Sequence, residues 1–340
     1  NRAAADDDLA RLVTLEVVLA NMRLLRPIFL LSDGHKGRVC LQVNPKEHGN
    51  PDAMIRDALF FHQNLSNRLD GGVPNVLFKI PGTKAGLEAA RTLTAQGIGV
   101  TITVNFGMFQ HLPFAQAIAD GSAVYSCLVV MNGRLAFPVR DELLAKLDTL
   151  SATGIDAAQA REAAACAGVA VTKKLQSVLK AGGFDDRKIR SLVASLRIYR
   201  GDGYDDLPSA FPDVTEILGA DIVSVFPNVR EPFDAERSLP LRPHSIEEPV
   251  PPWVLRVLSH SEIFRQAYHI SKGLGQTKED DTFCPARELV LDNVEEVAAW
   301  PPNKQTLDQF CAAHDGLVRR IREHKKRATQ ISIESGVTET

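Results

Sequence analysis

The chain has 340 residues, of which 44% are hydrophobic and 24% are charged, and its formal net charge at pH 7 is −3. This composition can bury a full core as one large domain or two smaller ones. The small negative charge gives no general reason to expect a nucleic-acid partner, and no apolar run approaches the length of a membrane-spanning helix, so we expect no membrane insertion. Five widely spaced cysteines without a CxxC pair argue against a disulfide framework and indicate a reducing compartment.

Short β-rich runs alternate along the chain with stretches whose apolar residues recur at helical spacing. Repeated βα units predict a parallel sheet covered by helices, either open and doubly wound or closed into a (β/α)8 barrel. The predicted strands are 38–44, 75–81, 99–105, 123–132, 190–197 and 221–227, and the predicted helices are 51–69, 85–97, 110–121, 155–182 and 209–220.

One face of several predicted strands turns polar near the strand's carboxyl end, which favours the mouth of a barrel over an open sheet. Six strands cannot close an eight-stranded barrel, so we expect two further strands before Asn1, with an open fold as the alternative. The residues assigned to this face are Cys40, Gln42 and Asn44; Leu77 and Lys79; Thr101, Thr103 and Asn105; and Ser191, Val193, Ser195 and Arg197.

A lysine interrupts the strand in "NVLFKIPGTKAGLEA", residues 75–89. An uncompensated charge inside a strand costs several kcal/mol, of order ~2–7 for even an unpaired polar group. Lys79 therefore either extends its amine to the edge of an apolar surface, or is buried where a lowered pKa serves chemistry.

From residue 230 the pattern changes to the Pro-rich "LPLRPHSIEEPVPPW", followed by helical stretches and the basic "GLVRRIREHKKRATQ". We predict a barrel over residues 1–229, and over 230–340 a Pro-rich linker and a helical C-terminal extension packed on the barrel. The basic run is interpreted as a solvated helix face rather than a nucleic-acid site.

The segment "PNVLFKIPGTKAGLEAARTLTAQGIGVTITVNFGMFQ" resembles the transaldolase family nearly position by position, in its lysine-bearing strand, its helix and the threonine strand that follows. The resemblance extends from about residue 10 to about 227 and is looser in "NGR" (132–134) and "VASLR" (193–197). It implies a (β/α)8 TIM barrel of the transaldolase type, whose first two strands would precede Asn1. It also implies transfer of a dihydroxyacetone unit between sugar phosphates through a Schiff base on Lys79, a pentose phosphate pathway reaction without a cofactor.

The resemblance also assigns roles to single residues. Thr103 matches the family's threonine that orients a water molecule, and Arg134, Ser195 and Arg197 match residues that hold the substrate phosphate. A guanidinium suits a phosphate because it can bind two oxygens at once. The alternative for both arginines is a surface salt bridge.

Gln42 stands where the family carries a glutamate that activates water. A glutamine can position water but cannot take its proton. The fructose-6-phosphate aldolase branch of the family also has glutamine there, together with a tyrosine at the position of Met131 in this chain. The family's acid/base aspartate, and an asparagine, would precede Asn1.

Three hypotheses follow: an active transaldolase, an aldolase that uses Lys79 with Gln42, or a catalytically impaired scaffold or assembly subunit. The C-terminal region is a candidate surface for homo-oligomer or protein assembly, and cytoplasm, organelle stroma and matrix all fit as compartments. No metal is expected, because the nine histidines lack HxxxH or HExxH spacing.

Overall fold

The computed structural model describes residues 6–69, 72–201, 203–204, 207, 209–239, 241–272 and 274–334, with side chains up to residue 327. Its centre is one curled sheet of six strands in the order β1-β2-β3-β4-β5-β6, and each neighbouring pair is parallel. All six predicted strands are confirmed. Their bounds are β1 (Val39–Gln42), β2 (Val76–Pro81), β3 (Val100–Thr103), β4 (Ser126–Met131), β5 (Ile189–Ala194) and β6 (Ile222–Val223).

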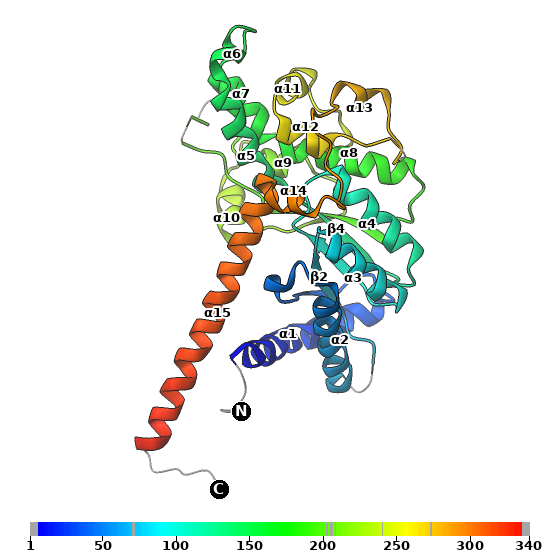
Figure 1. The fold of residues 1–340 in the computed structure, drawn as a ribbon, viewed down its shortest axis with the longest axis vertical. Coiled ribbons are helices and arrows are strands. Elements are labelled where there is room, and N and C mark those ends of the chain that lie inside the picture. The colour runs from blue at the N-terminus through cyan, green and yellow to red at the C-terminus, as the bar shows by residue number, and fades with distance from the viewer. Residues whose placement is uncertain are drawn as a thin grey trace.

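Helices connect the strands and cover the outer face of the sheet (Figure 1). Local capping explains where two of them begin: the side chain of Asn50 accepts a bond from Ala53 N, and that of Thr83 from Gly86 N. The helices up to residue 235 are α1 (Asp6–Leu31), α2 (Pro51–Arg68), α3 (Lys84–Ala95), α4 (Met108–Asp120), α5 (Asn132–Ala145), α6 (Leu147–Ser151), α7 (Ala157–Ala165), α8 (Ala167–Ala181), α9 (Pro212–Thr215) and α10 (Pro227–Ala235), with a 3-10 turn at Pro45–Glu47.

The main core lies between the outer face of the sheet and these helices. On β2 this face carries Val76, Phe78 and Ile80, all buried in the largest apolar cluster. The inner face has its own small cluster, in which Leu77 packs near Cys127. Parallel strands buried on both faces read as nearly continuous apolar runs, and Lys79 stands out against that background.

The described strands form a half-barrel rather than a closed one, because β1 and β6 are the two edges of the sheet. Cys40 on β1 is accordingly exposed although it faces inward. The two additional strands that would close the barrel remain an expectation.

Residues 236–334 add further helices that pack on the sheet's helices: α11 on α7, α12 on α4, α5 and α8, and α15 on α1 and α5. Their bounds are α11 (Pro252–Leu258), α12 (Glu262–Tyr268), α13 (Lys278–Thr282), α14 (Val294–Ala299) and α15 (Pro301–Glu334), with a 3-10 turn at Ser245–Glu247. The division of the chain at residue 229 is still our proposal.

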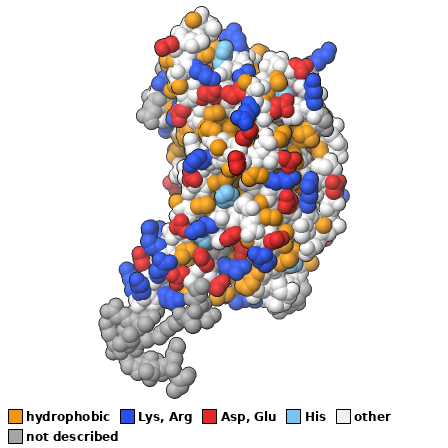
Figure 2. Space-filling model, viewed as in Figure 1, with side chains coloured by type: hydrophobic (Ala, Val, Ile, Leu, Met, Phe, Trp, Pro, Cys, Tyr) orange, Lys and Arg blue, Asp and Glu red, His pale blue; other side chains and the backbone are white. Residues whose placement is uncertain are grey.

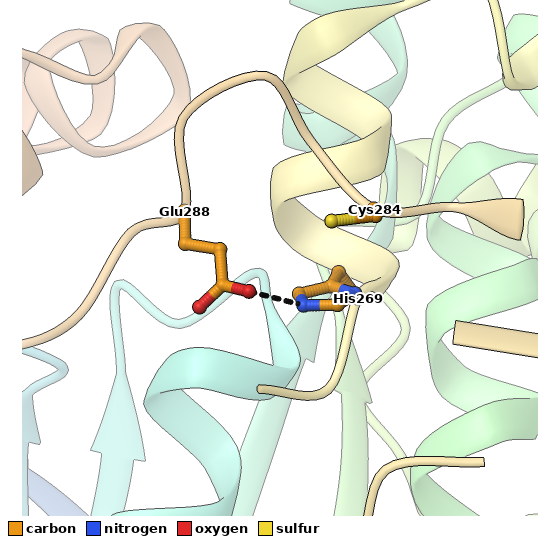
Figure 3. A group of neighbouring side chains, drawn as sticks. All are labelled: His269, Cys284 and Glu288. Atoms are coloured by element: carbon orange, nitrogen blue, oxygen red, sulfur yellow. Dashed lines mark hydrogen bonds and ion pairs between the residues drawn. The ribbon is translucent and has the colours of Figure 1, made fainter. Parts of the chain in front are cut away.

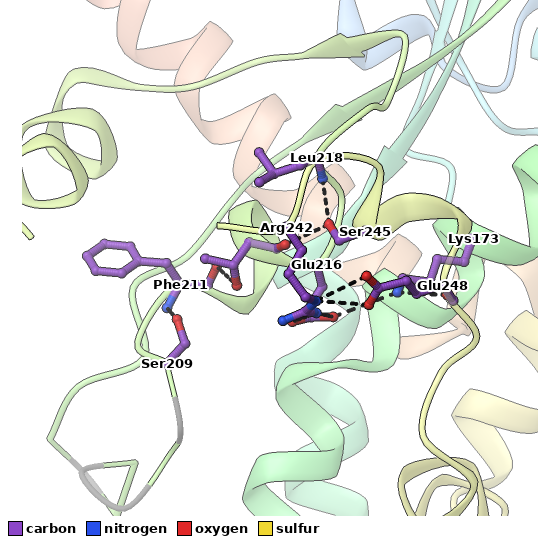
Figure 4. Close-up of polar contacts among 9 residues, drawn as sticks. Lys173, Ser209, Phe211, Glu216, Leu218, Arg242, Ser245 and Glu248 are labelled. Carbon is purple, nitrogen blue, oxygen red and sulfur yellow. Dashed lines mark hydrogen bonds and ion pairs between the residues drawn. The ribbon is translucent and has the colours of Figure 1, made fainter. Parts of the chain in front are cut away.

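Two clusters of charged side chains link residues 236–334 to the helices around the sheet. Arg242 binds the carboxylates of both Glu216 and Glu248, and Lys173 on α8 donates to the carbonyl of Glu248 at 3.0 Å (Figure 4). The second is a buried ion pair of 2.5 Å between Lys174 on α8 and Asp280 on α13. The first cluster joins Lys173 of α8 and Glu216, which follows α9, to residues 242–248. The second joins α8 to α13.

The far half of α15 extends away from the sheet (Figure 1), and its Lys and Arg side chains gather at that end (Figure 2). Arg319 and Arg320 are exposed, whereas Arg322 pairs with Asp6 in the first turn of α1 at 2.7 Å. No helix among the described residues is long and apolar enough to cross a membrane.

Candidate active site

Lys79 lies on the inner face of β2, level with Gln42 on β1 and Thr101 on β3. Its side chain is partly buried. Burial lowers the pKa of the Lys79 amine; the Cys40 thiol opposes this shift, and the positive charge of Arg134 adds to it. A larger share of the amine is therefore neutral, and nucleophilic, than in a solvated lysine.

The lysine borders a cavity of about 640 Å³ that is lined by the sheet and by helices α1, α2 and α15. Gln42 and Lys79 come from the sheet, Arg11 from α1, and Phe310 and His314 from α15. The cavity is large enough for a small metabolite, since ligand sites typically measure roughly 300–1,000 Å³.

The side-chain amide of Gln42 forms hydrogen bonds with the backbone. Its Nε2 donates to the carbonyl of Val43 at 3.1 Å and to that of Lys79 at 3.3 Å. The amide thus ties β1 to the lysine strand. Gln42 lies beside Lys79, but both hydrogen bonds of its amide go to the protein backbone.

Thr103 ends β3 and aligns with Pro81, just beyond Lys79 on the neighbouring strand. The side chain is buried, and its hydroxyl donates to the sulfur of Met131 at 3.8 Å. The next residue, Val104, has φ of 51°, a conformation that costs a β-branched residue energy and turns the chain sharply out of the strand.

Arg134 lies in the first turn of α5 and meets α15. Its Nη1 donates to Oε1 of Gln309 at 2.5 Å, and its guanidinium carbon lies 5.4 Å from the ring centre of Phe310. The amine of Lys79 lies 5.8 Å from the same ring centre. Phe310 therefore contacts both candidate substrate-binding cations. Burial, and then the charge of Arg197, lowers the pKa of Arg134.

The predicted face of β5 is wrong. The register pairs Cys127 with Arg190 and Leu128 with Ser191, so the inner face of β5 carries Arg190, Leu192 and Ala194. Ser191 and Val193 lie on the outer face instead: both are buried, and Val193 belongs to an apolar cluster with Val169 of α8 and Val229 of α10. Ser191 also donates to Asp221, just before β6, at 3.2 Å.

The predicted face assumes that side chains alternate without interruption from Ser191 to Arg197. Ser195 is buried and has φ of 59°, so the extended backbone, and with it the alternation, ends there. Arg197 then lies against Gly133, where a Cβ would come within 2.2 Å of the arginine Cγ. That close approach explains the glycine in "NGR" and brings Arg197 beside Arg134.

Asp213 on α9 supports Arg197 and was missed by sequence reasoning. Its Oδ2 accepts bonds from Arg197 N at 2.9 Å and from the Tyr199 hydroxyl at 3.2 Å. The side chain is fully buried, and burial raises its pKa to about 7. A single aspartate after a proline, in a four-residue helix, carried no signal that could have predicted this role.

A carboxylate beside Lys79 is not found among the described residues. The groups that shift the pKa of Lys79 are its own burial, Cys40 and Arg134. The most deeply placed cavity carboxylate, Asp57, is bound to Arg11 at 2.7 Å and to Asn44 N at 3.0 Å. The described residues of the site therefore offer a candidate nucleophile, Lys79, and two arginine cations, but no carboxylate next to the lysine that could act as a general acid or base.

Comparison with known proteins gives the family. A model of the transaldolase/fructose-6-phosphate aldolase family matches residues 2–197, more than half of the chain. The chain belongs to this family. It is 29% identical over 195 residues to transaldolase 1 of Streptomyces avermitilis, covering 57% of this chain and 43% of that protein.

Other relatives match over shorter lengths. The chain is 33% identical over 120 residues to the transaldolase of Mycobacterium ulcerans, covering 35% of this chain and 31% of that protein. It is 37% identical over 81 residues to the transaldolase of Chlamydia muridarum, covering 24% of each. The chain thus spans less than half the length of these curated relatives, and the family match ends at residue 197.

Proposed function

We propose that this chain is a transaldolase-like transferase that binds a phosphorylated ketose and attacks its carbonyl carbon with the amine of Lys79. The observation that carries the proposal is the partly buried Lys79, whose pKa is lowered, at a cavity of about 640 Å³. The match to the transaldolase/fructose-6-phosphate aldolase family supports it, since the chemistry of that family uses a Schiff base. A neutral amine adds to the carbonyl, water leaves, and the resulting iminium accepts the electron pair when the neighbouring carbon–carbon bond breaks.

In this proposal, Arg134 and Arg197 bind the phosphate group of the substrate. The two guanidinium groups come from α5 and from the chain after β5, and the charge of Arg197 lowers the pKa of Arg134, as expected for neighbouring cations. Two neighbouring guanidinium groups favour a dianion such as a phosphate monoester. Ser195 directly follows β5 on the same segment as Arg197, and Thr103 would orient the water that releases the product.

A second candidate is an impaired or altered enzyme, and the bonding of Gln42 favours it. The amide occupies the glutamate position and donates to two backbone carbonyls. Loss of a general acid or base typically costs about 10²–10⁴-fold in rate. An aldolase that relies on Gln42, or a scaffold that keeps the barrel without the reaction, would both follow from this loss.

Borohydride trapping tests the nucleophile directly. The full chain is incubated with fructose 6-phosphate and borohydride, and the intact mass and peptide map are measured. A dihydroxyacetone-sized addition on Lys79, absent from Lys79→Ala, supports attack and bond cleavage. Lys84→Ala is the matched control, because Lys84 lies on the same βα unit and pairs with Asp292.

An adduct that persists in Lys79→Ala would refute the assignment. No adduct on a folded wild-type chain, tested beside an active transaldolase, would favour the scaffold. If the adduct forms, adding an aldose phosphate acceptor separates transfer from simple aldol cleavage.

Gln42→Glu tests the second candidate. In the wild type, Nε2 donates to two carbonyls, so an ionised carboxylate at this position would face the same two acceptors and be repelled by them. We expect the two carbonyls to favour the neutral form of the introduced carboxyl group, so that it can both give a proton to and take one from the reacting water, which Gln42 cannot do. Turnover should then rise at least tenfold. An unchanged or lower rate would place the defect elsewhere.

The proposed setting is a compartment of soluble sugar-phosphate metabolism, the cytoplasm or an organelle stroma or matrix. Assembly with a second copy or another protein through residues 230–340 remains part of the proposal.

A further inference from the structure

Three side chains far from the candidate active site converge between α12 and α14. They are His269, which directly follows α12, and Cys284 and Glu288, which lie on the loop after α13 (Figure 3). Their ligand atoms all lie within 4.8 Å of one another. His269 is buried, whereas Cys284 and Glu288 are exposed. Imidazole, thiolate and carboxylate are three donor types that zinc accepts in proteins.

Both ring nitrogens of His269 face hydrogen-bond acceptors. Its Nδ1 lies 3.2 Å from the carbonyl oxygen of Asp280, and its Nε2 lies 2.8 Å from Oε1 of Glu288. Both partners are acceptors, yet a neutral imidazole has only one N–H to donate. A neutral imidazole that donates to one of these acceptors keeps its other ring nitrogen free to bind a cation, and Nε2 is the one beside Glu288 and Cys284.

The surroundings favour the cation. Metal-binding histidines almost always donate their second ring N–H to a carbonyl or carboxylate, and the Asp280 carbonyl is placed to receive it. Asp280 itself is fixed, because its carboxylate binds Lys174 at 2.5 Å and accepts from Thr277 N at 2.7 Å. The imidazole is therefore held with Nε2 directed at Glu288 and Cys284.

The loop that carries the other two groups is also tied down. Gln266 on α12 donates to the carbonyl of Arg287 at 3.1 Å, and Arg287 N donates to Glu262 at 3.1 Å. These two bonds hold the residue before Glu288 against the helix that precedes His269. Zinc bonds of about 2.0–2.3 Å require ligand atoms roughly 3–4 Å apart, so atoms that already lie within 4.8 Å of one another need only small side-chain movements to bind the ion.

We propose that His269, Cys284 and Glu288 bind a divalent zinc-like cation through Nε2, Sγ and a carboxylate oxygen. Binding releases the thiol proton of Cys284 to solvent, so the two anionic ligands balance the charge of the cation. Three protein ligands leave the fourth tetrahedral position to water. The bound ion joins the end of α12 to the loop after α13. This site does not depend on the proposed reaction at Lys79.

The sequence patterns that argued against a metal could not detect this site. They test for two histidines on one helix or for paired cysteines, whereas these ligands are one histidine, one cysteine and one glutamate separated by 14 and 3 residues. Among the described residues this is the one group of three such side chains whose ligand atoms lie this close.

Cobalt(II) titration of the full, metal-stripped chain tests the proposal. A cobalt–thiolate charge-transfer band should appear at one equivalent and disappear when zinc is added. Cys284→Ser should abolish the band, and Glu288→Gln should weaken cobalt binding by at least about tenfold. Cys40→Ser controls for the other exposed cysteine, and Glu295→Gln for an exposed glutamate nearby; both should keep the band.

Thermal unfolding gives an independent readout. Zinc should raise the melting temperature of the wild type and of both controls, but not of Cys284→Ser or Glu288→Gln. Both substituted side chains are exposed, so these variants should fold. No cobalt–thiolate band in the wild type, or a band that survives in Cys284→Ser, would overturn the site and leave His269 as a hydrogen-bond partner of Glu288 only.

Discussion

At the scale of single residues, the buried Asp213 holds the backbone of Arg197, a candidate phosphate-binding residue, in place. Its carboxylate accepts from the backbone of Arg197 and from Tyr199, and burial raises its pKa to about 7. The folded chain therefore holds a proton on Asp213 over a pH range in which the unfolded chain, with a pKa near 3.8, has lost it. This difference destabilises the fold progressively as pH rises from about 4 to about 7.

Asp213→Asn should remove that dependence. The amide oxygen can still accept both bonds but never ionises, so the stability of the variant relative to wild type should rise between pH 4 and 7 and then level off. Urea unfolding at several pH values measures this. Asp221→Asn, a partly exposed aspartate that accepts from Ser191, is the control. Parallel curves for Asp213→Asn and wild type would contradict the shifted pKa.

Arg134 and Arg197 should matter only for substrates that carry a phosphate. If they hold the phosphate, Arg134→Ala or Arg197→Ala should raise KM for a sugar phosphate by at least tenfold and change KM for dihydroxyacetone little. Arg140→Ala is the control, because Arg140 is a nearby arginine of α5 that pairs with Asp141. Equal effects on both substrates would argue that the arginines support the fold.

At the scale of elements, α15 is the part of the site that sequence reasoning did not place. Phe310 contacts both Lys79 and Arg134, and Gln309 binds Arg134 although the two residues are 175 positions apart. The helix was predicted, but a lone aromatic residue on its face gave no indication of which part of the sheet it would meet.

Phe310→Ala tests whether that contact desolvates the lysine. Removing the ring should rehydrate Lys79 and bring its pKa closer to the ordinary value, so the pH at which amine labelling becomes half-maximal should rise. Adduct formation with fructose 6-phosphate should then slow several-fold at neutral pH. Leu317→Ala, also on α15 at the same cavity, is the control. An unchanged labelling profile would mean that Phe310 does not desolvate the amine.

The strands illustrate what can be predicted and what cannot. All six follow from β-rich runs between turn residues, and the lysine follows from a charge that interrupts such a run. The faces of β5 were wrong because a positive φ at Ser195 ends the alternation, and no residue type there signals it. Tertiary contacts, rather than the local preference of serine, fix the backbone of Ser195 at a φ of 59°.

At the scale of the whole molecule, the buried pair of Lys174 and Asp280 joins α8 to α13. Their side chains are 6% and 0% exposed. Burial raises the pKa of Asp280, but the bonds from Lys174 and Thr277 outweigh it, and the net shift is downward. The pair therefore contributes stability above the unfolded pKa and loses it as pH falls through the lower folded pKa.

Asp280→Ala should lower the free energy of unfolding by about 3–5 kcal/mol, because it leaves Lys174 buried without a partner. Chemical unfolding at pH 7 measures the change. Asp281→Ala, at the exposed neighbouring position, should cost no more than about 0.5 kcal/mol. A small loss for Asp280→Ala would mean that Lys174 reaches solvent once it is released.

The contact of α15 with Lys79 also sets an order of events during synthesis. Domains generally fold from the N-terminus as the ribosome releases them, and the last strand of the half-barrel ends at Val223, well before α15 begins at Pro301. Until α15 docks, Lys79 lacks the ring of Phe310 and is more hydrated, so less of its amine is neutral and nucleophilic. The surroundings of Lys79 described above are therefore complete only after α15 has been made and has docked.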